Sequence, residues 1–294
     1  MPVTFPAFAC RLPISTPDGQ GAFIAVGGSG AVTFIPQAAG VHYYDRAFSK
    51  WLPASREAVS PDGAHYAYAE IGTNSDFIVH VVDVATGKDH AFHELTSTTG
   101  VNFQTSVLSY TNEGVYLVQG FEQLGAGLWL VNPTTGSVRQ ISSTLKPVAV
   151  APGVVWAQVL NPADPNPIVT GSSAGTLPNE IDRFDLASGN QTLWLYRPGT
   201  GVGIIGFDLG GHPVISSIHQ FRENDDPEAE VVIALGPDSN RSIYKGSLAK
   251  TLAGGIADAH GIWFGSGQGI YLYSQADGLQ KITNQPGSPA NGCF

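Results

Sequence analysis

The chain has 294 residues, a formal net charge of −10 and only 13% charged residues, about half the usual share of a soluble domain. So acidic a chain with so few Lys and Arg residues argues against nucleic-acid binding, because phosphate contacts need a basic face. No apolar run approaches the length that crosses a bilayer, and a hydrophobic content of 43% is enough for a large folded core.

The two ends of the chain each carry one cysteine, Cys10 and Cys293. They are either two unrelated thiols or a disulfide that ties the termini together. The even cysteine count and the low lysine content favour the disulfide of an extracellular protein. The first four residues lack the basic and apolar parts of a signal peptide, so we expect a secreted or cell-surface protein whose signal peptide has been removed.

Two kinds of short turn alternate along the whole chain. Gly, Asn and Asp at these positions supply the positive φ and the local hydrogen bonds that tight hairpins need. The first kind resembles Pro-Asp-Gly and occurs at 16–19, 60–63 and 111–114, then in weaker form at 151–153, 209–211 and 258–261. The second kind ends in a small residue or Gly and occurs at 36–40, 83–87, 132–136, 185–189, 236–240 and 275–278. Six turns of each kind predict six repeated units.

The segments between the turns predict β-strands, because they are short and rich in β-branched and aromatic residues. Clear examples are 65–69, 77–82, 115–118, 128–131, 153–157, 262–264 and 270–273. No apolar period of 3.6 residues extends beyond two turns. Four strands per unit, here A to D, and six units predict an all-β, six-bladed β-propeller with four antiparallel strands per blade. A pair of β-sandwiches is the alternative architecture.

The turn spacing divides the single propeller domain, 1–294, into blades without any strand exchanged between the two ends. The disulfide would then close the ring, with the termini adjacent and the tail crossing the seam. The expected blades are 8–46, 53–95, 103–143, 146–197, 202–248 and 252–284, followed by a closing tail at 285–294.

Residues 60–88, SPDGAHYAYAEIGTNSDFIVHVVDVATGK, resemble the repeat of the TolB-type, WD40-like propellers. Residues 111–141 and 179–196 follow the same repeat more loosely, and 260–283 resembles the blades of streptogramin-lyase-like proteins. The resemblance implies a propeller fold. It implies no activity, because the family includes scaffolds, binding proteins, peptidase domains and several enzymes.

The predicted site lies on the face formed by the B–C and D–A connections, because these loops are long and loops on rigid scaffolds often bind ligands. Polar residues at or near strand ends bordering these loops on blades three to five are the candidate ligand-binding residues: Glu122, Arg197, His219, Arg222 and Glu223. The acidic stretch 223–230 is either a solvated loop, a weak Ca²⁺ site with Asp225 and Asp226, or half of a catalytic carboxylate pair with Glu122 or Asp164. We expect no other metal or cofactor.

No nucleophile or phosphate-binding motif is present, so the sequence favours a binding or scaffold module over an enzyme. Its partner would be a small molecule, a glycan or a protein on the loop-rich face. The alternative is an extracellular carbohydrate- or ester-active hydrolase or lyase, with carboxylates and a histidine in the central funnel. A third reading is a structural module of a larger cell-surface assembly.

Overall fold

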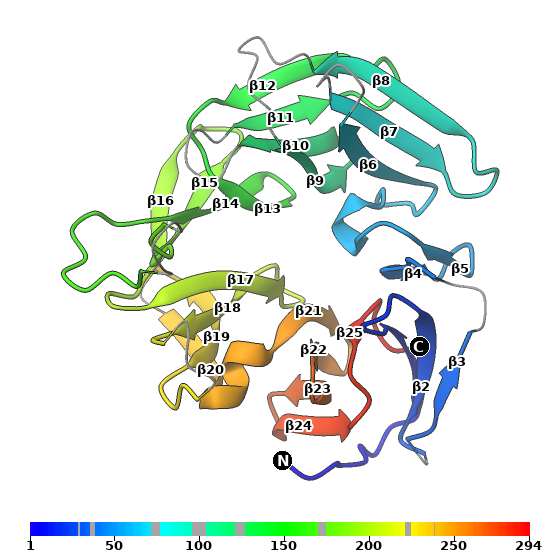
Figure 1. Ribbon diagram of the computed structural model, residues 1–294, viewed down its shortest axis with the longest axis vertical. Helices are drawn as coiled ribbons and strands as arrows, with labels where there is room; N and C mark the ends of the chain where they lie inside the picture. The colour runs from blue at the N-terminus through cyan, green and yellow to red at the C-terminus, as the bar shows by residue number, and fades with distance from the viewer. Residues whose placement is uncertain are drawn as a thin grey trace.

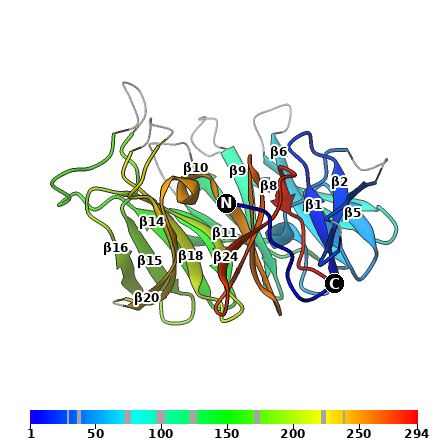
Figure 2. The same cartoon turned by 90° about the horizontal axis from the view of Figure 1, so that it is seen from below.

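The computed structural model describes residues 1–28, 30–35, 39–71, 77–95, 104–120, 127–169, 175–220, 225–237 and 239–294. These residues form an all-β structure in which short sheets stand side by side around a ring (Figure 1). Seen from its edge, the ring has strands running between its two faces (Figure 2). The described part of the chain contains no helix long and apolar enough to cross a bilayer.

The expected turns form as local hydrogen-bonded units. In the first kind, the backbone N–H of Gly63 donates to the carbonyl of Ser60, and the Ser60 hydroxyl donates to Asp62 at 2.6 Å. In the second kind, the N–H of Gly87 donates to the carbonyl of Asp83 at a glycine φ of 71°. Both kinds of turn therefore arise from residues within a few positions of each other.

The middle of the chain gives antiparallel sheets whose strands follow in sequence order. Each strand pairs with the one before it through a short turn or a loop. The sheets are β6–β8 (His65–Ile71, Phe77–Asp83, Asp89–Leu95), β9–β12 (Gln104–Thr111, Gly114–Gly120, Leu128–Val131, Val138–Ser142) and β13–β16 (Pro147–Ala151, Val154–Val159, Glu180–Asp185, Gln191–Tyr196). A single bridge from Val59, just after the 3₁₀ helix η1 (Arg56–Ala58), extends β6–β8 beyond β6.

The last two sheets join through one parallel pair. Gly206 of β17 lies opposite Gly255 of β21, where a Cβ on Gly206 would lie 2.3 Å from the Gly255 carbonyl oxygen. Glycine at both positions allows this close approach of two backbones. The strands are β17–β20 (Gly201–Phe207, Pro213–Ile218, Glu230–Gly236, Ser239–Lys245) and β21–β24 (Ala253–Asp258, Gly261–Ser266, Gly269–Ser274, Gly278–Thr283), separated by η2 (Ser247–Thr251).

The core lies between neighbouring sheets, so both faces of a sheet are buried. On β14, Trp156 packs with Ile181 and Ile215 toward β17–β20, while Val155 and Ala157 pack toward β9–β12. Alternate residues of a strand point to opposite faces, and here both sets are apolar. This explains strands that are apolar throughout instead of alternating with polar residues.

The two ends of the chain meet as predicted, and a disulfide joins Cys10 to Cys293. The expectation that no strand is exchanged between the ends was wrong. β25 (Ser288–Pro289) pairs with β1 (Cys10–Ser15) in the order β25-β1-β2-β3, and Val3 pairs with Lys281 of β24. The reason is that β1 would otherwise be an unpaired edge strand, and the tail supplies partners for its backbone groups. The remaining strands of this sheet are β2 (Gly21–Val26) and β3 (Val32–Phe34).

The expected fourth strand of the first blade also pairs differently. β4 (Tyr43–Asp45) forms a two-stranded sheet with β5 (Lys50–Leu52) instead of extending β3. The N–H of Tyr44 donates to the carbonyl of Ala290 in the tail, which holds β4 beside the seam. Tyr44 and Trp51 of this hairpin pack against Phe23, so these aromatic side chains serve the junction between sheets.

Candidate functional site

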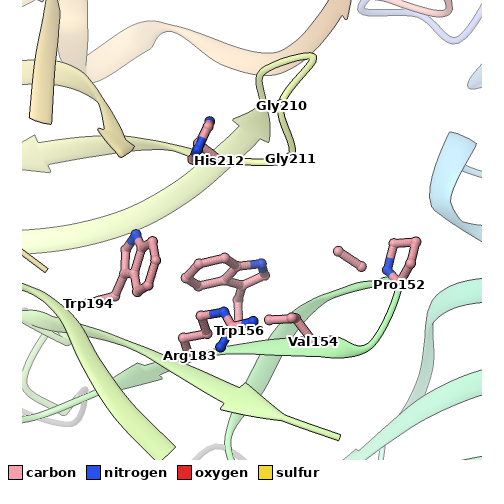
Figure 3. A pocket seen from close by; sticks show the side chains of 9 residues that line it. Pro152, Val154, Trp156, Arg183, Trp194, Gly210, Gly211 and His212 are labelled. Atoms are coloured by element: carbon pink, nitrogen blue, oxygen red, sulfur yellow. The ribbon is translucent and has the colours of Figure 1, made fainter. Parts of the chain in front are cut away.

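A cavity of about 320 Å³ opens between sheets β13–β16 and β17–β20. Its rim includes the turn after β13 and the turn after β17, so it opens on the face of short turns. We call it the tryptophan pocket, because two indole rings form its floor (Figure 3). Its lining residues are Ala151, Pro152, Val154, Trp156, Arg183, Trp194, Gly210, Gly211 and His212.

The floor of the pocket is rigid because its tryptophans are held by both sheets. Trp156 of β14 lies edge-on to Trp194 of β16, with ring centroids 5.3 Å apart. The indole N–H of Trp194 donates to the carbonyl of Ala234 on β19, at 3.0 Å, and so links the two sheets. The rings are inclined by 76° and Trp156 is almost wholly buried, so Trp194, which is half-buried, provides the indole face that a ligand ring can contact.

The opposite wall is the turn between β17 and β18, which carries His212. Its backbone N–H donates to Asp208 at 2.8 Å, and its Nδ1 lies 3.0 Å from the same carboxylate. A Cβ at position 210 would lie 2.8 Å from the His212 ring, so Gly210 is needed for this placement. Asp208 thus orients the imidazole and leaves Nε2 as its second polar atom.

Arg183 of β15 supplies the positive charge of the pocket. Its guanidinium lies over the Trp194 ring at 5.9 Å from the centroid and 3.8 Å from Asp185. A guanidinium has five N–H donors, so this single long ion pair leaves donors for a ligand. Indole surface beside a guanidinium suits a ligand that combines a ring with an anionic group.

The buried indole N–H of Trp156 adds a further observation. Trp156 is 3% exposed, and its Nε1 makes no hydrogen bond within the described structure. Buried donors are nearly always paired. The indole N–H groups of Trp51 and Trp129 are also buried without a partner in the described structure, so this feature is not specific to the pocket.

A second cavity, of about 270 Å³, opens on the same face between β9–β12 and β13–β16. Its polar lining consists of Arg139, Glu113 and Tyr116, and the Tyr116 hydroxyl donates to Glu113. Burial and the neighbouring Glu113 carboxylate raise the pKa of Tyr116, which keeps this hydroxyl protonated. Its lining contains no indole ring, and this distinguishes it from the tryptophan pocket.

Two of the predicted site residues are described, and both contact the protein itself. Arg197 lies just after β16, and its guanidinium is 3.6 Å from Glu230 at the start of β19. The backbone N–H of His219 donates to Asp226 at 2.7 Å, and its ring is 3.9 Å from the same carboxylate. Glu122, Arg222 and Glu223 lie outside the described residues. A ligand site on the loop-rich face therefore stays a prediction.

The weak calcium candidates also have contacts within the protein. Asp226 is fully buried and accepts the N–H groups of His219 and Gln220. Burial opposes its ionisation, but these N–H groups outweigh it and lower the pKa of Asp226. Asp225 accepts the Ser247 hydroxyl. Within the described ranges, no group of three or more His, Cys, Asp or Glu side chains is arranged to hold a metal ion.

Asp164, considered as a partner in a catalytic carboxylate pair, organises the loop before β15. It accepts the N–H groups of Asn166 and Gly199 and the side-chain amide of Asn179. These bonds lower its pKa. Asp164 therefore serves as a hydrogen-bond acceptor for three segments of chain.

Sequence reasoning did not single out the residues of the tryptophan pocket. The signal available was two tryptophans, Trp156 and Trp194, within one predicted blade, beside a Gly-Gly-His turn in the next. That signal could not identify a cavity, because large aromatic residues in propeller strands usually fill the space between sheets.

No family model and no curated protein matches this chain. Among solved structures, a candidate 6-phosphogluconolactonase from Bacteroides uniformis covers 96% of this chain and 98% of its own, with a TM-score of 0.54 and 9% identity. A prolyl endopeptidase covers 94% of this chain, with a TM-score of 0.53 and 12% identity. The chain folds as a β-propeller. 

The propeller also resembles TolB from Acinetobacter baumannii at the level of the fold, over 96% of this chain at 13% identity and a TM-score of 0.46. The chain spans 65% of that TolB chain and 51% of the prolyl endopeptidase chain. At these identities the propeller likeness concerns the fold alone.

Proposed function

We propose that this propeller is an extracellular binding module that holds a small acidic sugar in the tryptophan pocket. One observation carries the proposal: a rigid indole floor and a guanidinium line the same cavity. Sugar rings stack on indole faces, and a guanidinium pairs with a carboxylate through two parallel hydrogen bonds. A cavity of about 320 Å³ lies at the small end of ligand pockets.

The Cys10–Cys293 disulfide supports the extracellular location, because disulfides persist in oxidising compartments. We further propose six blades. The sheet that contains β25 and β1–β3 is the first, β6–β8 with Val59 is the second, and β9–β24 form four more. The β4–β5 hairpin is then a connector between the first two blades.

The test is a titration of tryptophan fluorescence with D-glucuronate and, in parallel, with neutral D-glucose. We expect saturable binding of the acid and at least tenfold weaker binding of the neutral sugar, since a charge-assisted hydrogen bond is lost. Arg183→Ala should reduce glucuronate affinity by roughly tenfold, and Trp194→Phe should reduce the fluorescence response. Trp129→Phe, in β11, is the matched control and should change neither.

Two results would contradict the proposal. One is equal binding of the acid and the neutral sugar. The other is glucuronate binding that survives Arg183→Ala unchanged. If binding instead depended on Arg197 and His219, the site would lie on the loop-rich face, as the sequence predicted.

A further inference from the structure

Among the described residues, the face of β6–β8 that points toward the β4–β5 hairpin is covered by a small element. The hairpin has two strands, where each of the sheets β9–β12, β13–β16 and β17–β20 has four (Figure 1). Its Leu52 and Tyr43 pack on Tyr66, Val59 and Val84. Farther along β6, Tyr68 is 36% exposed, whereas Tyr116 on β10 and Trp156 on β14 are at most 3% exposed.

The exposed ring of Tyr68 belongs to a fixed cluster of four side chains. It stacks on the imidazole of His80 with ring centroids 4.4 Å apart and an interplanar angle of 4°. Asp89 of β8 joins the two rings, because its carboxylate lies 2.8 Å from His80 Nδ1 and accepts the Tyr68 hydroxyl at 3.2 Å. The cluster therefore has little conformational freedom to lose when something binds to it.

Glu70 completes the cluster on the other side of the imidazole. Its carboxylate oxygen is 3.2 Å from His80 Nε2, a nitrogen that is buried and makes no hydrogen bond in the described structure. The side chains of Glu70 and Asp89 are 54% and 40% exposed. The two carboxylates thus lie at the two ring nitrogens of His80, on which the exposed Tyr68 ring is stacked, and we call this surface the Tyr68 patch.

The local charge favours a cation. Lys50, on the neighbouring hairpin, is directed to the carbonyls of Val84 and Ala85, at 2.6 and 3.1 Å. Among the described groups, a single basic side chain, His80, therefore lies against the two carboxylates. Burial and then the charge of Asp89 raise the pKa of Tyr68. Negative potential over an aromatic face is the environment in which a cation stacks on a ring.

We propose that the Tyr68 patch is a docking site for an arginine side chain presented by a partner polypeptide. A guanidinium is planar, so it can stack on Tyr68 while its N–H groups reach Glu70 and Asp89. The patch is an open surface, and a polypeptide carrying the arginine would cover the ring and exclude water from the ion pairs. This site is independent of the tryptophan pocket, which lies between other sheets.

The test uses the peptide acetyl-Gly-Ser-Arg-Ser-Gly-amide and its citrulline analogue, which is nearly isosteric and uncharged. Titrations are followed by NMR on the ring resonances of Tyr68 and His80. We expect the arginine peptide to shift both resonances in a saturable way and the citrulline peptide to shift neither. Arg183→Ala should leave these shifts unchanged, which separates this site from the proposed sugar site.

The variants Glu70→Gln and Asp89→Asn should each weaken peptide binding about two- to fivefold, the range of exposed ion pairs. Tyr68→Ala should abolish it, and Tyr68→Phe, which keeps the ring, should retain it. Asp277→Asn is the charge-matched control on an exposed turn far along the chain and should have no effect. Thermal melting checks that each variant is folded.

Equal shifts from the citrulline peptide would overturn the proposal. So would an Asp277→Asn effect as large as that of Glu70→Gln, because binding would then reflect the net charge of −10 and not this patch. Loss of binding in Tyr68→Phe to the same extent as in Tyr68→Ala would show that the ring is not the contact.

Discussion

Two tryptophans occupy the same position in two sheets and have opposite surroundings. Trp156 on β14 lies opposite Ala149 on β13, and Trp263 on β22 lies opposite Ile256 on β21. Trp263 is fully buried at the seam, and its indole N–H donates to Asp258 at 2.7 Å. Trp156 borders a cavity, and its N–H has no partner in the described structure.

The difference follows from one residue at the end of the preceding strand. Asp258 ends β21, and the equivalent position at the end of β13 is Ala151. Asp258 also accepts the N–H of Cys293 at 2.7 Å, so it joins the tryptophan to the tail. Trp263 thus helps to hold the C-terminal tail where the ring closes. The equivalent Trp156, between β13–β16 and β17–β20, lies beside a cavity.

The largest expected effect is on the seam and comes from removing the disulfide in the double variant Cys10→Ser and Cys293→Ser. The bond spans 283 positions, so its loss should lower the free energy of unfolding by about 5 kcal/mol in the chain-entropy model. Differential scanning calorimetry should show a melting temperature lower by roughly 10 °C or more. A change below about 2 °C would show that β25 alone closes the ring.

The two tryptophans should differ in what their removal costs. Trp263→Phe leaves a buried gap and removes one of the donors to Asp258, so we expect a loss of about 3 kcal/mol. Trp156→Phe removes an unpaired donor beside existing space, so its cost should be about 1 kcal/mol or less. Urea unfolding of both variants measures the difference, and equal losses would contradict the comparison.

On the opposite face of the ring, the free energy of unfolding should depend on pH through Asp226, which lies in the β18–β19 connection. Its pKa is lower in the folded protein than in the unfolded chain, so its contribution is present at neutral pH and is lost as the pH falls through the folded value. Asp226→Asn should cost about 2 kcal/mol at pH 7. The difference in free energy of unfolding between Asp226→Asn and the parent protein should become smaller below pH 4. Urea unfolding at both pH values provides the measurement, and a constant difference would exclude this role.

The smallest change in stability should come from giving Trp156 the carboxylate partner that Trp263 has. Ala151→Asp places at β13 the carboxylate that Asp258 provides at β21, within reach of Trp156. We expect a gain in stability of about 0.5–1 kcal/mol, together with loss of glucuronate binding as the side chain enters the pocket. Ala151→Asn provides the uncharged control. Retention of full binding in Ala151→Asp would show that the ligand does not use this part of the cavity.

The local elements of the propeller were predictable because they depend on neighbours in sequence. The Ser60–Asp62 turn and the Gly87 turn form through bonds within a few residues. The disulfide was predictable from two cysteines at opposite ends. Arg197 and His219 lie at strand ends, as expected, and their role in ligand binding stays a prediction. Their contacts with Glu230 and Asp226 depend on how the β18–β19 connection folds.

The sequence by itself determined the strands, their turns and the covalent closure. Strand propensity and turn chemistry depend on residues close together in the sequence, and two cysteines allow a single pairing. Only the tertiary structure decided that the tail enters the first sheet, that β4 leaves it, and that a cavity opens beside Trp156. Each of these depends on which backbone edges and side chains meet between sheets far apart in the chain. Trp156 and Trp263 occupy equivalent strand positions, but the residue that ends the preceding strand differs, Ala151 in one case and Asp258 in the other. The tail that Asp258 also binds gives Trp263 a role that Trp156 does not have.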